Sequence, residues 1–502
     1  MMIMKKIFFA ILATAALLSS CGKDFVTVKH NSSEPLDEYF INEARMYQSL
    51  VAAYDSLEWL DYFDQYCNAL TLASDIMADD IYCGGSNEGD QPVLVKTHYY
   101  TLTSTDVLDR IWTICYSGIN RSCIVIEYVD SVPGMSDDTK ALYKAEAMVL
   151  RAFYYNLLWK YWGNIPYYDK NLAAPYIAPQ LKADEVYAKC VGHLETVFEM
   201  DVLPMKAAAG SEGRVTKAMA YMLYAEMVMY QNDSSRYGTA LGYMKEIITS
   251  TQYSLVSDFA SIWLESGEWG SESIWEINYT SEGAVRSWGA PLATGGTVYP
   301  MLIGVPGATE ASGFSDGWGF GPVAKSAYDM YDDGDQRRDG GILCYNDLFE
   351  PIPAEKTRWQ HTGYYLLKYI ARRSGTHGQL ADADMNHCNN VRVYRYAETL
   401  LNAAELSVLT GGDGSAYLAE VRQRAGSKDT GTDQRAIIEE RHKEFVGEGK
   451  RYWDLVRSGL AQEVLKSANH EWRKIDWSPS KKYWPLPQSE CDKDPNLKQN
   501  AY

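Results

Sequence analysis

The sequence predicts a mainly α-helical protein, in which successive helix pairs of tetratricopeptide-like character carry a loop-rich lobe with short strands. Apolar residues recur at three- and four-residue steps through both halves of the chain, which is the period of an amphipathic helix. Small residues occupy the seams where paired helices would cross. Between residues 253 and 392, Gly, Ser, Pro and aromatic residues become dense, which is typical of loops.

The first half of the chain is expected to be mostly helical. The clearest helix spans 137–162, because Ser136 can cap it, Asp137 and Asp138 lie in its first turn, and Gly163 stops it. The helices expected in this half span 40–60, 107–128, 137–162, 183–200, 216–230 and 238–249.

The second half is expected to begin with the loop-rich lobe and to return to helices. Within the lobe, 273–279 and 364–370 resemble short strands. Helices are expected at 393–409, 416–425 and 435–460, and the tail from Lys482 is predicted to be extended. We therefore expect a helical region over 21–250 and a second region over 251–502, with a ligand-binding insertion at 253–392.

The amino terminus predicts export and lipidation. Lys5 and Lys6 precede an apolar stretch over 7–18, which is the pattern of a secretory signal and is too short to span a bilayer. Small residues then lead to Cys21, as in the bacterial lipoprotein box, so we expect residues 1–20 to be a signal peptide and Cys21 to be acylated. The alternative is a plain signal peptide with an incidental cysteine.

Composition and charge exclude several classes of function. The 502 residues are 46% hydrophobic and include 47 basic and 66 acidic side chains, which give a net charge of -19. A field of this sign repels phosphate backbones, so no nucleic-acid partner is expected. The nine cysteines show no metal-ligand spacing, and we assign no metal site, no cofactor and no catalytic residue. Calcium binding stays open at this point. Gly313 to Gly317 match a nucleophile-elbow pattern but lack the strand before and the helix after.

Seven strings occur in order along the chain. They lie at 145–155 running into 162–166, 213–221, 272–279, 334–338, 395–405, 440–455, and 483–487 with 496–500. The sixth contains Glu440-Arg441 and continues through Gly447-Glu448-Gly449 to Asp454-Leu455. Together these strings resemble the SusD/RagB family of Bacteroidetes outer-membrane lipoproteins over essentially the whole mature chain. One departure is His442, where a second Arg is usual.

The resemblance implies a SusD-like α-solenoid scaffold with a looped lobe. It further implies a lipid-anchored protein of the outer membrane, facing the cell exterior, that captures an oligosaccharide and delivers it to a SusC-type TonB-dependent transporter. Such proteins are not catalysts. Two alternatives stay open at this point: a transporter lid of the same family that binds peptide, and a surface glycoside hydrolase.

Sugar binding requires flat apolar ring faces with polar groups beside them. Two loop-rich regions, 79–100 and 269–318, offer this combination. Within the second, Trp288 and Trp318 lie in Gly-rich loops that have no helical face to fill. The candidate glycan-binding residues are Asp80, Tyr82, Asn87, His98, Trp269, Arg286, Trp288, Tyr299, Asp316 and Trp318. Charged residues within the matched strings are instead expected to form buried ion pairs and backbone anchors. They are Arg151, Lys217, Arg395, Glu440, Arg441 and Asp454.

Overall fold

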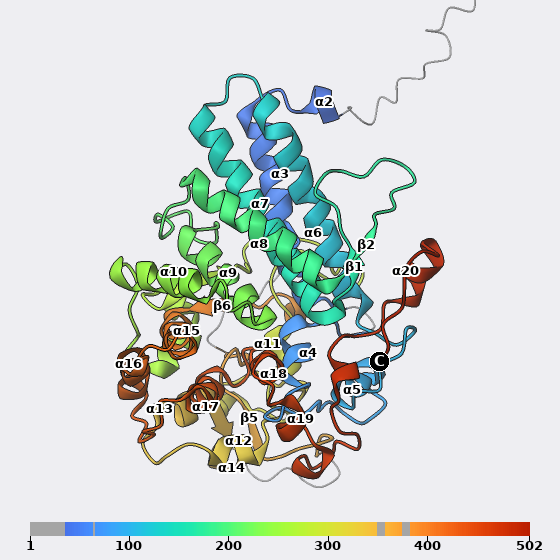
Figure 1. Cartoon of the computed structure of the whole chain (residues 1–502). Helices are drawn as coiled ribbons and strands as arrows, with labels where there is room; N and C mark the ends of the chain where they lie inside the picture. The colour runs from blue at the N-terminus through green and yellow to red at the C-terminus, as the bar shows by residue number, and fades with distance from the viewer. Residues whose placement is uncertain (1–35, 64–65, 349–356, 374–381) are drawn as a thin grey trace, which may run out of the picture.

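The computed structural model describes residues 36–63, 66–348, 357–373 and 382–502, and the protein is mainly α-helical, as predicted (Figure 1). Cys21 lies outside the described residues. The longer helices are α3 (Glu43–Asp55), α6 (Asp109–Tyr128), α7 (Asp137–Trp162), α8 (Ala183–Met200), α9 (Lys217–Gln231), α10 (Tyr237–Thr249), α15 (Tyr396–Leu409), α16 (Ser415–Ala425) and α17 (Gln434–Phe445). The shorter helices are α2 (Leu36–Tyr39), α4 (Leu70–Asp75), α5 (Pro92–His98), α11 (Tyr299–Ile303), α12 (Lys325–Asp329), α13 (Gln336–Gly341), α14 (Tyr345–Leu348), α18 (Arg451–Arg457), α19 (Ala461–Val464) and α20 (Gln488–Lys493).

Successive long helices pack against one another as a stack. Helix α6 contacts α3 and α7, α7 contacts α8, α8 contacts α9, and α9 contacts α10. The stack then passes from α10 to α15, whose other neighbours are α16 and α17. Figure 1 shows α3, α6, α7 and α8 side by side at one end of the molecule and α15, α16 and α17 toward the other. This neighbour-to-neighbour packing is the arrangement that tetratricopeptide-like pairs produce.

Helix α7 has the bounds that its sequence predicts. The Ser136 hydroxyl accepts a hydrogen bond from the Thr139 backbone N–H at 3.1 Å, and Gly163 ends the helix with φ = +67°. Every residue from Ala145 to Trp162 is buried, because neighbouring helices cover α7 on several sides. Helix α7 is therefore the central helix of the amino-terminal stack, in contact with α3, α6, α8 and α9.

Within the described residues, six short strands form three two-stranded antiparallel sheets. They are β1 (Ile165–Pro166), β2 (Gln180–Leu181), β3 (Ser273–Ile277), β4 (Ile342–Cys344), β5 (Tyr364–Leu366) and β6 (Val391–Arg395). Strand β3 pairs with β6, which joins the start of the lobe to the segment that leads into α15. The strands predicted at 273–279 and 364–370 are therefore present but shorter.

Two predicted helices and the predicted extended tail of the second half were wrong in part. The helix predicted at 393–409 begins at Tyr396, because Val391–Arg395 pairs with β3 instead. The helix predicted at 435–460 is two helices, since Gly447 and Gly449 adopt φ values of +76° and +70° between α17 and α18. The tail predicted to be extended contains the short helix α20.

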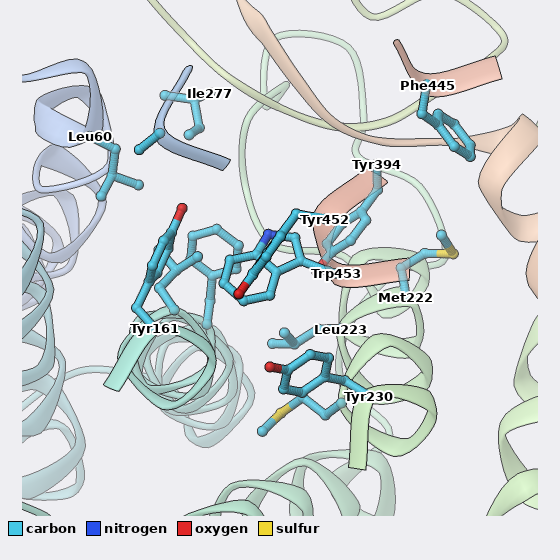
Figure 2. Packing of buried hydrophobic residues seen from close by; sticks show 14 of the residues in the cluster. Leu60, Tyr161, Met222, Leu223, Tyr230, Ile277, Tyr394, Phe445, Tyr452 and Trp453 are labelled. Carbon is cyan, nitrogen blue, oxygen red and sulfur yellow. The ribbon is translucent and has the colours of Figure 1, made fainter. Parts of the chain in front are cut away.

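The hydrophobic core continues from the amino-terminal stack into the carboxy-terminal helices. Figure 2 shows Tyr161 of α7, Tyr230 of α9, and Tyr452 and Trp453 of α18 packed together. The rings of Tyr161 and Trp453 lie edge-to-face at 4.8 Å, and those of Tyr230 and Trp453 at 5.8 Å. Many of the aromatic residues therefore fill the interior, where edge-to-face pairs add to the effect of burial. In the part of the chain that the structure describes, no helix is long and apolar enough to cross a membrane.

Candidate functional site

Three aromatic rings from separate segments meet at the surface of the lobe. Trp288 is 40% exposed, Trp318 is half-buried, and Phe63 is buried beside both. The Phe63 ring lies 5.4 Å from Trp288 and 5.5 Å from Trp318, and the two indoles are 5.9 Å apart with an interplanar angle of 32°. We call Phe63, Trp288 and Trp318 the aromatic platform. In the platform, the planes of the Trp288 and Trp318 indoles are inclined to each other by 32°, and both rings contact the buried Phe63 ring.

A buried ion pair fixes the loop that carries Trp288. Arg286 lies two residues before Trp288, and its Nη2 is 2.8 Å from Oδ1 of Asp61, which lies two residues before Phe63. Arg286 also donates to the backbone carbonyls of Pro291 and Gly296 at 2.9 and 2.8 Å. The second carboxylate oxygen of Asp61 accepts from the Thr297 hydroxyl at 2.6 Å. Arg286 is 2% exposed. The ion pair therefore joins the segment that carries Phe63 to the segment that carries Trp288.

Close backbone contacts position the loop that carries Trp318. The Trp318 backbone N–H donates to the Met301 carbonyl at 2.9 Å. Gly317 approaches the backbone of Gly304 so closely that an added Cβ would lie 2.2 Å from its carbonyl carbon, so glycine is required there. Asp316 is exposed beside this loop, and its Oδ1 accepts from the Gly307 N–H at 2.6 Å. The carboxylate retains lone pairs for further hydrogen bonds.

The other candidates of the lobe lie at different places. Tyr299 is buried, with its ring 5.7 Å from Tyr369, and Arg286 is the anchor described above. Trp269 packs beside β3, where its indole N–H donates to Asn278 Oδ1 at 3.1 Å. Asn87 is exposed in a loop next to the Trp318 segment, since the Gly85 N–H donates to the Gly319 carbonyl at 3.1 Å. Trp288 and Trp318 are thus the lobe candidates whose side chains the structure brings together, and Asp316 lies two residues before Trp318 in the same loop.

Tyr82, Asp80 and His98 are buried, which leaves them out of reach of a ligand at the surface. The Tyr82 ring packs edge-to-face on His470 and Trp472, at 4.5 Å from each. The Nδ1–H of His98 donates to the Ile76 carbonyl at 2.8 Å. Their sequence neighbourhood, rich in aromatic and polar residues, is equally typical of a packed polar cluster, which is what the structure contains.

Acid should destabilise the protein through His98. Burial and the neighbouring Arg473 guanidinium lower the pKa of His98 to about 3. The unfolded chain takes up this proton below about pH 6.5, whereas the folded chain stays neutral, so the stability present above pH 6.5 is lost as the pH falls. We expect this group alone to reduce the free energy of unfolding by about 2 kcal/mol at pH 5.

Urea unfolding of the chain and of His98→Asn at pH 7.5 and pH 5 measures this effect. The asparagine amide can still donate to Ile76 but does not titrate, so the variant should lose less stability between the two pH values. Equal losses in both proteins would show that His98 does not contribute.

The charged residues of the matched strings form the expected ion pairs and anchors. Arg395 pairs with Glu272, Glu444 and Glu448, and Arg441 pairs with Asp454. The remaining contacts join Glu440 to Arg337 and Arg422, Lys217 to Asp201, and Arg151 to the Asp169 carbonyl. These residues therefore hold the scaffold together.

Phe63 was missed by sequence reasoning. It lies just beyond the first long helical stretch, in an aromatic run that continues to Tyr66, and it is 8% exposed. A buried ring that supports exposed rings has the sequence appearance of an ordinary core residue. Only its contacts with Trp288 and Trp318 reveal its place in the platform.

The helical stack and the exposed platform define a binding protein built on an α-helical scaffold. Comparison with known proteins gives the family. The model of the SusD family matches residues 350–502, and a second model, described as "Starch-binding associating with outer membrane", matches residues 26–226. The chain belongs to the SusD family, whose members are binding proteins and not enzymes. The alternative of a surface glycoside hydrolase is therefore not supported.

Solved structures and sequence relatives agree with this assignment. Surface glycan-binding protein A from Bacteroides thetaiotaomicron is 44% identical, with a TM-score of 0.86 over 92% of this chain and 100% of that one, and it has also been solved in complex with laminarihexaose. Surface glycan-binding protein A from Bacteroides uniformis is 41% identical, with a TM-score of 0.82 over 92% of this chain and 100% of that one. SusD-like protein P25 of Formosa agariphila is 24% identical over 88% of this chain and 87% of that protein.

Proposed function

We propose that this protein is a cell-surface lipoprotein that captures an oligosaccharide on the aromatic platform and delivers it to a SusC-type TonB-dependent transporter. The observation that carries the proposal is the juxtaposition of Trp288 and Trp318 over Phe63 at the surface of the lobe. Pyranose rings present flat C–H faces, and aromatic rings of this kind bind them by apolar contact. Asp316 and Asn87 are the polar groups beside the platform that we expect to accept or donate hydrogen bonds to sugar hydroxyls.

We propose a β-1,3-linked glucan as the ligand. A relative that is 44% identical has been solved with laminarihexaose, a chain of β-1,3-linked glucose. The 32° angle between the two indoles fits a ligand whose successive rings turn relative to one another, as they do in a β-1,3-glucan. A flat, fully extended chain would contact one of the two indoles less completely.

Attachment to the outer membrane through an acyl group on Cys21 is part of the proposal. It is supported by the signal-like residues 5–18, by the small residues before Cys21, and by a matching family model whose description associates its members with the outer membrane. A tethered protein stays near a transporter in the same membrane, which raises its effective concentration there. Weak affinity for the isolated ligand is compatible with this role if the transporter completes the binding site.

Calorimetric titration with laminarihexaose, cellohexaose and maltohexaose tests the proposed ligand. We expect saturable binding of laminarihexaose, at least tenfold tighter than that of the other two hexasaccharides. We also expect the hexasaccharide to be recovered intact after prolonged incubation, since the chain binds without hydrolysis. Equal affinity for all three would contradict the β-1,3 preference, and the absence of binding to any glycan would contradict the proposed function.

A further inference from the structure

Three side chains of types that can bind metals come together from two distant parts of the sequence. Asp79 and Asp80 lie between α4 and α5, and His442 lies on α17. One ligand atom of each residue lies within 4.8 Å of one ligand atom of the other two. Asp80 is fully buried, His442 is 8% exposed, and the Asp79 side chain is 21% exposed. The three side chains therefore form a mostly buried group, and Asp79 is the member nearest to solvent.

Asp80 and His442 contact each other at ion-pair distance, but their facing ligand atoms make no hydrogen bond with the described residues. Neither carboxylate oxygen of Asp80 accepts a hydrogen bond from any described residue, and the same is true of His442 Nε2. Buried polar groups normally have hydrogen-bond partners, because an unpartnered one destabilises the folded state. The distance from His442 Nε2 to Asp80 Oδ2 is 3.6 Å, which is too long for a hydrogen bond. Two ligand atoms bound to one tetrahedral Zn²⁺ lie about 3.4 Å apart, given bonds of about 2.1 Å.

We propose that Asp79, Asp80 and His442 form a binding site for one divalent transition-metal cation, for which Zn²⁺ is the best fit. One imidazole nitrogen with carboxylate oxygens is a donor set that suits Zn²⁺ better than Ca²⁺, which takes six to eight oxygen ligands. Three protein ligands leave a fourth position for water at the edge where Asp79 reaches solvent.

The charges around the three residues favour a cation. Arg451 donates to both carboxylate oxygens of Asp79, at 2.9 and 3.1 Å, and carboxylate oxygens retain lone pairs for a further ligand. Glu439 Oε2 lies 3.7 Å from both His442 Nδ1 and Arg451 Nη2. Asp79, Asp80 and Glu439 contribute −3 and Arg451 contributes +1, which leaves −2 when His442 is neutral. A divalent cation balances this charge.

His442 is the member of the group whose own charge can change. When it is protonated it forms an ion pair with Asp80, and when it is neutral it offers Nε2 as a nitrogen ligand. In the neutral case a bound cation would supply the positive charge.

The cation would stabilise the segment that follows Trp318 of the aromatic platform. The Asp80 carbonyl accepts from the Ala324 N–H at 2.8 Å, and Ile81 pairs with Val323, so the segment after Trp318 is bonded to the loop that supplies two ligands. His442 then joins that loop to α17. The site would thus clamp together segments about 360 residues apart in the sequence.

Metal titration of the tag-free full chain tests the proposal. After treatment with EDTA and dialysis, we expect the chain to bind one equivalent of ZnCl₂ by calorimetry, and its Tm to rise with Zn²⁺ concentration. His442→Gln should bind Zn²⁺ at least tenfold more weakly, whereas the matched control His361→Gln should bind like the unaltered chain. His361 lies elsewhere, with its Nδ1 2.7 Å from the Tyr365 hydroxyl.

His442→Arg keeps the test decisive if the glutamine variant does not fold. Arginine places a positive charge beside Asp80, so we expect this variant to fold with a Tm at least as high as that of the EDTA-treated chain, and to show no further rise with Zn²⁺. Failure of the unaltered chain to take up one equivalent of Zn²⁺ would overturn the proposal. Equal uptake by His442→Arg, or uptake of Ca²⁺ in place of Zn²⁺, would overturn it as well.

Discussion

Replacing Trp288 with alanine is expected to weaken laminarihexaose binding by about 30-fold, and the same substitution at Trp318 by a similar factor. Each indole presents one ring face to the ligand, and losing a well-packed aromatic contact of this kind costs about 2 kcal/mol, or about 30-fold in Kd. The double substitution should reduce binding below detection by calorimetry, because Phe63 is too deeply buried to replace the two faces.

Trp269→Ala is the matched control for these variants. Trp269 is also a partly exposed tryptophan of the lobe, but it packs beside β3, with its indole bonded to Asn278. We expect its substitution to leave the Kd for laminarihexaose within about twofold. If Trp269→Ala weakened binding as much as Trp288→Ala, while circular dichroism showed all variants folded, the ligand would have to bind elsewhere on the lobe.

The helices were predictable where one local signal marked each end. For α7, a serine cap, acidic residues in the first turn and a terminating glycine all lie in the sequence itself, and the observed bounds are those predicted. The break between α17 and α18 also has a local signal in Gly447 and Gly449, but the helical periodicity continues past these glycines and favoured one unbroken helix. The start of α15 was missed for a different reason, since pairing of Val391–Arg395 with β3 depends on a strand more than 100 residues earlier.

The candidate site was predictable only in part. Gly-rich loops with no helical face pointed to Trp288 and Trp318, and the structure brings these two rings together. Sequence alone does not distinguish a charged loop residue that contacts ligand from one that anchors the loop, and Arg286 proved to be buried against Asp61. Burial of this kind depends on the tertiary fold, because the partner of Arg286 lies more than 200 residues away in the sequence.

The largest charged cluster of the described chain lies between the lobe and the carboxy-terminal helices. Its members are the cations Arg337, Lys368, Arg395, Arg422 and Arg424 and the anions Glu272, Asp335, Glu440, Glu444 and Glu448. Five positive and five negative charges balance, which explains how so many charged groups can be buried together. Burial raises the pKa of Glu444, but the guanidinium groups of Arg424, Arg395 and Arg337 outweigh it and lower that pKa to about 2.

Arg395→Met should destabilise the protein by about 3–5 kcal/mol. Arg395 is 1% exposed and pairs with Glu272, Glu444 and Glu448, so methionine would fill the space of its stem and leave three buried carboxylates with one cation fewer. Arg435→Met is the matched control, because Arg435 pairs with Glu463 on the surface, where both side chains are more than half exposed. Its loss should leave the free energy of unfolding almost unchanged, because exposed ion pairs are screened by solvent. Urea unfolding at neutral pH measures both, and a similar small loss in the two variants would mean that the buried cluster adds no more stability than a surface pair.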